Sequence, residues 1–187
     1  MLAGNSFKKK YLITLFILIL TLMQSAEAKD KNQLYSFSSV QQAISPDESA
    51  SRLIFGISYF NVFRDKKNAF EGRVEYRSSL EFFSLQPFAG LSFTSSGAYY
   101  GMAGIFSDIS LDDNLIFTPS FGAGYFNKGF GLDLAYELEF RTMFEISYIL
   151  QNDSRIGFGF YHISNGNLGR SNPGAENFTF LFSLPIN

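Results

Sequence analysis

Apolar and polar residues alternate along most of the chain from Arg52 onward, which is the pattern of β-strands with two different faces. Eight such runs can be distinguished, and short segments rich in Asp, Asn, Gly and Ser, the residues that favour turns, separate most of them. The runs cover residues 52–62, 70–79, 82–94, 98–109, 114–126, 133–149, 154–164 and 176–184. The pattern therefore predicts an all-β domain.

The run from Tyr136 to Tyr148 is the clearest, because its even positions are almost all apolar while its odd positions are mostly ionisable. Strands of soluble proteins are typically about 5–6 residues long. A strand that crosses a bilayer needs roughly 9–11 residues, with apolar side chains toward lipid and polar ones inside. The length of this run and the even number of runs predict an eight-stranded antiparallel transmembrane β-barrel. A secreted, lipocalin-like barrel is the alternative.

The charged positions of this pattern should face the barrel interior. An eight-stranded barrel is just wide enough for side chains to fill it, so these groups are expected to pair with one another and to leave no wide pore. The residues expected in this network are Glu137, Glu139, Arg141 and Glu145, together with Arg73, Glu75 and Arg77.

The first 28 residues have the pattern of a secretory signal peptide. Lys8, Lys9 and Lys10 precede an apolar segment at residues 11–23, and Ala26-Glu27-Ala28 supplies small residues for cleavage. The apolar segment is short for a membrane-spanning helix, which needs roughly 20 residues. We therefore expect a cleaved signal peptide at 1–28, a polar leader at 29–50 and the barrel domain at 51–187.

Composition supports the barrel and excludes several functions. The chain has 23 Phe and 10 Tyr, as expected for a barrel wall in contact with lipid. After removal of residues 1–28 it carries 12 basic and 16 acidic residues, so it lacks the basic surface that nucleic-acid binding requires. Without cysteine it can form neither disulfides nor thiolate metal sites, and one histidine cannot make a His-rich zinc site.

That one histidine, His162, falls in a polar group near the end of the predicted strand 154–164. With both chain ends in the periplasm, this strand ends at the cell exterior. Its lipid-facing positions include Phe158 and Phe160, and His162 and Ser164 continue the same face. Glu176 is in phase with the apolar face of the next strand. The three side chains should therefore meet at the depth of the outer-leaflet headgroups.

These three residue types are those of an acyl-transfer triad. A serine hydroxyl can act as nucleophile and an imidazole as base and then acid, while a carboxylate orients the imidazole. Polar groups on the lipid face of a barrel are costly unless they lie near an interface or have a function. Candidate oxyanion donors are the Asn172 side chain and the backbone amides of Asn165 and Gly166. The alternative is that the trio only makes the barrel rim polar.

This hairpin resembles the PagL-type lipid A 3-O-deacylases of Gram-negative outer membranes. The matching residues are Phe140-Arg141 and Glu145, then His162-x-Ser164-Asn165-Gly166-Asn167, and Asn172-Pro173-Gly174-x-Glu176. The resemblance implies an eight-stranded barrel in the cell outer membrane whose triad hydrolyses the ester-linked acyl chain at position 3 of lipid A, the membrane anchor of lipopolysaccharide. It also implies that Ser164 is the nucleophile, His162 the base, Glu176 the third member and Asn172 an oxyanion donor.

The implied mechanism needs no metal or cofactor, and the partners it predicts are lipopolysaccharide and the outer membrane, with no nucleic acid. A homodimer is one assembly that the sequence leaves open. Two other functions also stay open: a non-enzymatic structural or adhesive barrel, and an acyltransferase that moves an acyl chain between lipids.

Overall fold

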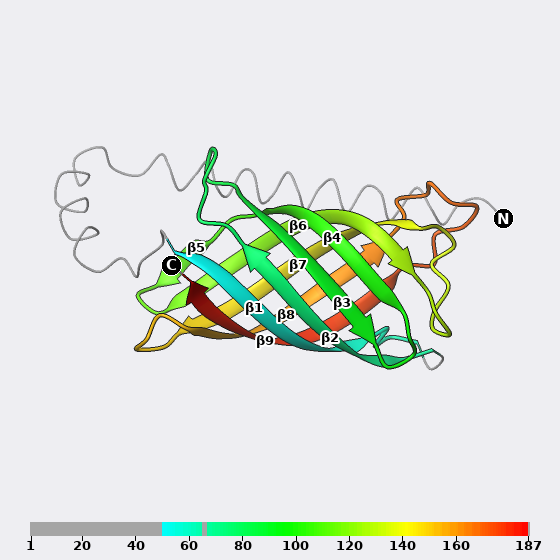
Figure 1. Ribbon diagram of the computed structural model, residues 1–187, viewed down its shortest axis with the longest axis horizontal. Coiled ribbons are helices and arrows are strands. Elements are labelled where there is room, and N and C mark those ends of the chain that lie inside the picture. Colours follow the sequence, from blue (N-terminus) through cyan, green and yellow to red (C-terminus); the bar gives the residue numbers. More distant parts are fainter. Residues whose placement is uncertain (1–49, 65–66, 187) are drawn as a thin grey trace. The chain divides into compact units, whose positions relative to one another are not determined.

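The computed structural model describes residues 50–64 and 67–186, and the predicted signal peptide and nearly all of the polar leader lie outside this range. The described residues form one antiparallel sheet (Figure 1). Its strand segments are β1 (Ser51–Phe60), β2 (Ala69–Arg77), β3 (Gln86–Thr94), β4 (Tyr99–Phe106), β5 (Ile109–Asp112), β6 (Leu115–Asn127), β7 (Leu138–Ile149), β8 (Arg155–Ser164) and β9 (Ala175–Ile186). No helix among the described residues is long and apolar enough to cross a membrane.

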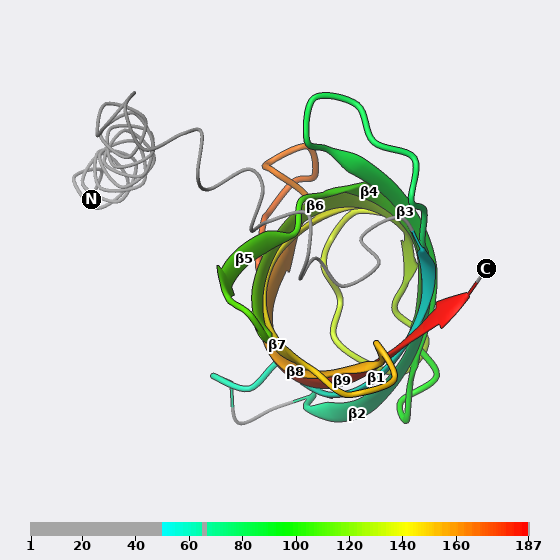
Figure 2. The same cartoon turned by 90° about the vertical axis from the view of Figure 1, so that its left-hand side faces the viewer.

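The sheet closes on itself, as the end-on view in Figure 2 shows. β1 pairs with β9, and β4 pairs with β6. The short segment β5 also pairs with β6, so β4 and β5 are two parts of one strand that is interrupted at Ser107 and Asp108. Counted in this way, the described residues form a closed eight-stranded antiparallel β-barrel, and the predicted fold class is confirmed.

Two predicted strands begin later than the alternation suggested, because the backbone before them turns. Phe83 and Ser84 both have positive φ angles, of 53° and 61°, and the flanking residues Phe82 and Leu85 exchange both backbone hydrogen bonds. This is the geometry of a tight two-residue hairpin turn, so β3 begins at Gln86. Ala135 has a φ of 68°, and β7 accordingly begins at Leu138.

Side chains alternate between the barrel interior and its outer face. Along β7, Glu139, Arg141 and Met143 are completely buried, whereas Leu138, Phe144 and Ile146 are exposed and Phe140 is half-buried. The apolar side chains therefore point away from the barrel axis, which is the reverse of a soluble protein and typical of a barrel that faces lipid.

An ion-pair network lies in the interior, together with buried apolar side chains such as Phe88 and Met143. Glu75 lies at its centre and pairs with three guanidinium groups, those of Arg73 at 3.2 Å, Arg77 at 3.6 Å, and Arg141. Arg77 also pairs with Glu145 at 2.7 Å. The predicted network is thus confirmed for these residues.

Two predicted members of the network behave differently. Glu137 is exposed in the loop before β7, so its prediction as an interior residue is wrong. Glu139 is buried, but neither carboxylate oxygen has a hydrogen-bond partner among the described residues.

Candidate active site

The β8–β9 hairpin brings His162 and Glu176 together on the outer face of the barrel. The two residues are directly paired across the strands, and His162 Nδ1 lies 3.3 Å from Glu176 Oε1. Their side chains are 43% and 28% exposed, respectively. A carboxylate at this ring nitrogen favours the tautomer whose other nitrogen, Nε2, is free to accept a proton. This contact agrees with the strand phase of the two residues in the sequence.

Ser164 lies two residues beyond His162 on the same face of β8, where its cross-strand neighbour in β7 is Phe140. Same-face neighbours on a strand are roughly 6.6 Å apart. Among the hydrogen bonds of the described residues, none joins the Ser164 hydroxyl to His162. Catalytic hydrogen bonds are often long without substrate and shorten in the complex, so the arrangement is compatible with a nucleophile and its base.

Gly174 packs directly against the imidazole. A Cβ atom at this position would lie 2.8 Å from His162 Cε1 and 3.4 Å from Nε2. The residue also has a φ of 62°, a conformation in which side chains are unfavourable. The absence of a side chain therefore lets the backbone at Gly174 approach the ring closely.

The loop that joins β8 to β9 is tightly bonded internally. Gly166 and Asn167 have φ angles of 61° and 69°, and the Leu168 amide donates to the Asn165 carbonyl at 3.0 Å, which is the geometry of a type I′ turn. The buried Asn165 side chain donates to the carbonyls of Leu134 and Ser171, at 2.9 and 2.8 Å. Asn165 thereby ties this loop to the β6–β7 loop, and both lie at the same end of the barrel (Figure 1).

The candidate oxyanion donors differ in availability. The Asn165 amide already donates to Asn172 Oδ1 at 3.1 Å, so it is engaged within the loop. The Asn172 side-chain nitrogen and the Gly166 amide have no hydrogen-bond acceptor among the described residues. These two groups are the candidate donors that are not engaged within the loop that follows Ser164.

A segment remote in sequence also supports the hairpin, and the sequence pattern did not indicate it. The Val62 amide donates to the carbonyl of Glu176 at 2.9 Å, the Asn61 amide donates to Asn177 Oδ1 at 2.8 Å, and the Arg64 guanidinium donates to the Pro173 carbonyl. The β1–β2 loop therefore fixes the start of β9, where Glu176 is located.

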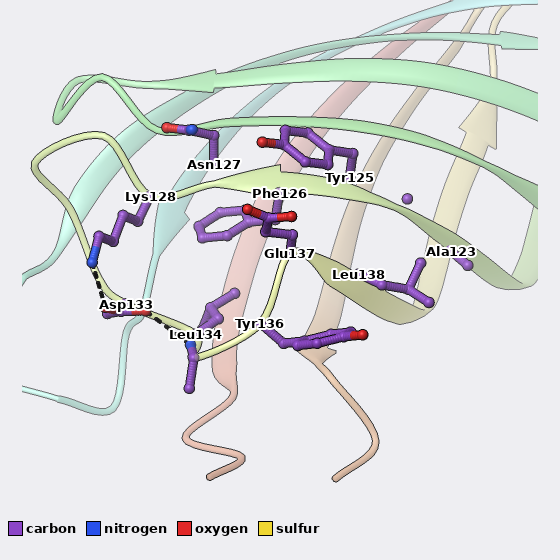
Figure 3. Close-up of a pocket in the computed structure, with 12 residues that line it drawn as sticks. Ala123, Tyr125, Phe126, Asn127, Lys128, Asp133, Leu134, Tyr136, Glu137 and Leu138 are labelled. Carbon is purple, nitrogen blue, oxygen red and sulfur yellow. Dashed lines mark hydrogen bonds and ion pairs between the residues drawn. The ribbon is translucent and has the colours of Figure 1, made fainter. Parts of the chain in front are cut away.

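A pocket lies at the end of β6 and in the β6–β7 loop (Figure 3). It has a volume of about 820 Å³, and its lining includes Tyr125, Tyr136 and Leu138 but none of the three candidate residues. At its edge an exposed Lys128 donates to Asp133 at 2.5 Å and holds the pKa of that carboxyl below its usual range. His162, Ser164 and Glu176 are partly exposed on the outer face of the barrel and do not line this pocket.

Metal ligands are not grouped in the described part of the chain: it contains no cluster of three or more His, Asp or Glu side chains able to hold an ion. The trio itself offers one imidazole and one carboxylate, which already contact each other. The arrangement thus consists of an imidazole, a carboxylate in contact with it, and a hydroxyl two residues away on the same strand face.

A closed antiparallel barrel with an apolar outer face belongs to the class of outer-membrane β-barrels. The family model described as lipid A 3-O-deacylase (PagL) matches residues 87–185, slightly more than half of the chain. The chain therefore belongs to the PagL lipid A 3-O-deacylase family. The matched residues include β8, the β8–β9 loop and all of β9 except Ile186. None of the curated proteins matches the chain.

Solved structures with the same fold include a member of this family. The crystal structure of the outer membrane enzyme PagL superposes with a TM-score of 0.58 at 15% identity, covering 72% of this chain and 99% of that chain. A de novo designed transmembrane β-barrel gives a TM-score of 0.56 at 8% identity, covering 74% and 96%. At these identities the structural similarity concerns the fold alone.

Proposed function

We propose that this protein is an outer-membrane serine esterase that removes the ester-linked acyl chain at position 3 of lipid A. The observation that carries the proposal is the contact between His162 and Glu176 on the lipid-facing surface, one same-face step from Ser164. Membership of the lipid A 3-O-deacylase family supplies the substrate class. A lipid beside the barrel could reach this surface laterally, without entering the interior.

In the first half-reaction, Ser164 Oγ bonds to the ester carbonyl carbon while His162 Nε2 takes the hydroxyl proton. Glu176 stabilises the imidazolium that forms. The negative oxygen of the tetrahedral intermediate accepts hydrogen bonds from the Gly166 amide and the Asn172 side chain. The bond to the sugar oxygen then breaks, and His162 returns the proton to that oxygen, which leaves as a hydroxyl.

In the second half-reaction, water attacks the acyl-serine and gives its proton to His162. The bond between the acyl carbon and Ser164 Oγ breaks, and Oγ recovers the proton. The products are a free fatty acid and a lipid A that lacks one acyl chain. All the side chains and amides that these steps require belong to this chain. The proposal includes export by a signal peptide that is cleaved after Ala28, followed by insertion into the outer membrane.

Mass spectrometry of lipid A from Gram-negative cells with and without this chain tests the proposal. We expect lipid A to lose one 3-linked hydroxyacyl unit in cells that carry the wild-type chain. Ser164→Ala should abolish the loss, whereas Ser110→Ala, which removes a hydroxyl from the exposed strand β5, should not. Equal deacylation by wild type and Ser164→Ala would refute the nucleophile. Transfer of the acyl group to another lipid, without free fatty acid, would indicate an acyltransferase instead.

A further inference from the structure

Three phenylalanine rings form a continuous surface beside the His162–Glu176 pair. Phe160 and Phe178 are directly paired across β8 and β9, one same-face step from that pair, and their ring centroids are 5.1 Å apart. Phe63, from the β1–β2 loop, packs against both rings, with centroid distances of 6.3 Å to Phe160 and 6.4 Å to Phe178. We call Phe63, Phe160 and Phe178 the aromatic platform.

Phe63 differs from the other two because a loop, not a strand, presents it. Its two sequence neighbours are both anchored to the hairpin: the Val62 amide donates to the Glu176 carbonyl, and the Arg64 side chain donates to the Pro173 carbonyl. The ring is nevertheless 68% exposed. An aromatic side chain that is held on both sides yet remains open offers apolar contact area at little cost in conformational entropy.

We propose that Phe63 determines acyl-chain specificity, by contacting the distal part of the chain that is being cleaved. This inference rests on the proposed function. From Ser164 to Phe160 the strand advances four residues, or roughly 13 Å. A short acyl group bound at Ser164 cannot cover that distance, whereas a long one passes His162 and reaches the aromatic platform. The contact therefore selects for chain length and leaves the chemical step unchanged.

Steady-state hydrolysis of p-nitrophenyl butyrate and p-nitrophenyl myristate by the folded full-length barrel in detergent micelles tests this inference. For Phe63→Ala we expect kcat/KM on the myristate ester to fall about tenfold, equivalent to about 1.4 kcal/mol, while kcat/KM on the butyrate ester changes less than about twofold. Phe63→Leu, which keeps an apolar side chain, should restore most of the preference for myristate. The matched control is Phe93→Ala, which removes an outer-face ring that is 60% exposed on β3.

The outcomes separate the inference from the function on which it rests. If the wild-type barrel hydrolyses neither ester nor lipid A, the proposed function fails. If the wild type is active but Phe63→Ala keeps its preference for the long ester, the acyl-chain contact is refuted. An equal loss of kcat/KM on both esters also refutes it, because Phe63 would then stabilise the active site and would not contact the acyl chain. If Phe93→Ala loses as much kcat/KM on the myristate ester as Phe63→Ala does, the effect is not specific to Phe63 and the inference is refuted.

Discussion

A methyl group at position 174 would occupy the space that the imidazole of His162 now fills. In Gly174→Ala the new Cβ would lie 2.8 Å from His162 Cε1, whereas carbon atoms in contact are normally about 3.5–4.0 Å apart. The ring must therefore move by roughly 1 Å, and its 3.3 Å contact with Glu176 is the interaction most exposed to that shift. A displacement of about 1 Å at a catalytic group can reduce the rate about 100-fold.

The same substitution has a separate cost in stability. Gly174 has a φ of 62°, and an L-residue in this left-handed conformation costs roughly 1–2 kcal/mol. Gly97→Ala is the matched control, because Gly97 has a φ of 77° but its Cβ would meet only Phe130, at 3.9 Å. Both variants should lose a similar free energy of unfolding, measured by circular dichroism in urea, and only Gly174→Ala should lose kcat.

The assay is the initial rate of ester hydrolysis by refolded barrels in micelles, with the folded fraction measured by gel mobility before and after heating. We expect kcat of Gly174→Ala to be about 100-fold below that of Gly97→Ala. If the two variants have the same kcat per folded molecule, then the packing of Gly174 does not position the imidazole and the reasoning is wrong.

Three further outcomes are expected. Glu176→Gln keeps the shape of the side chain but removes its charge, and kcat should fall at least about 100-fold with the fold intact; an unchanged kcat would exclude Glu176 from the triad. Asn165→Ala removes two donated hydrogen bonds and should lower the free energy of unfolding by about 2–3 kcal/mol, which urea titration would measure. Glu75→Gln should lower the free energy of unfolding by about 3–5 kcal/mol, because three arginines surround that carboxylate. The control Glu81→Gln, at an exposed site, should lower it by less than about 0.5 kcal/mol. Equal losses in the two variants would contradict the role of the interior network.

Most of the barrel could be predicted from the sequence, because strand periodicity is a local property. The alternation through β7 assigned the correct face to Arg141 and Phe144, and strand phase placed His162 on the outer face. The predicted strand bounds and faces were wrong where the backbone departs from the extended form. Glu137 lies before the strand begins and Ala135 turns with positive φ, which residue type alone did not indicate.

The parts of the candidate site that sequence could not supply are its long-range contacts. The β1–β2 loop reaches β9 only because the barrel closes between the first and last strands. Nothing in residues 61–64 indicates that they would bond to Pro173 and Glu176. The support that Gly174 gives to the imidazole likewise depends on three-dimensional packing.

The two faces of β8 serve different purposes that are joined by a single register. Tyr161, next to His162, points into the interior and donates to Glu71 Oε1 at 2.5 Å. If β8 were displaced by one residue, His162 would enter the interior and Tyr161 would face the membrane. The hydrogen bond between Tyr161 and Glu71 in the interior therefore helps to fix the strand register that places His162 on the outer surface. The lipid-facing residues of this barrel can therefore be substituted to accept another lipid, provided that the interior residues that fix the register are kept.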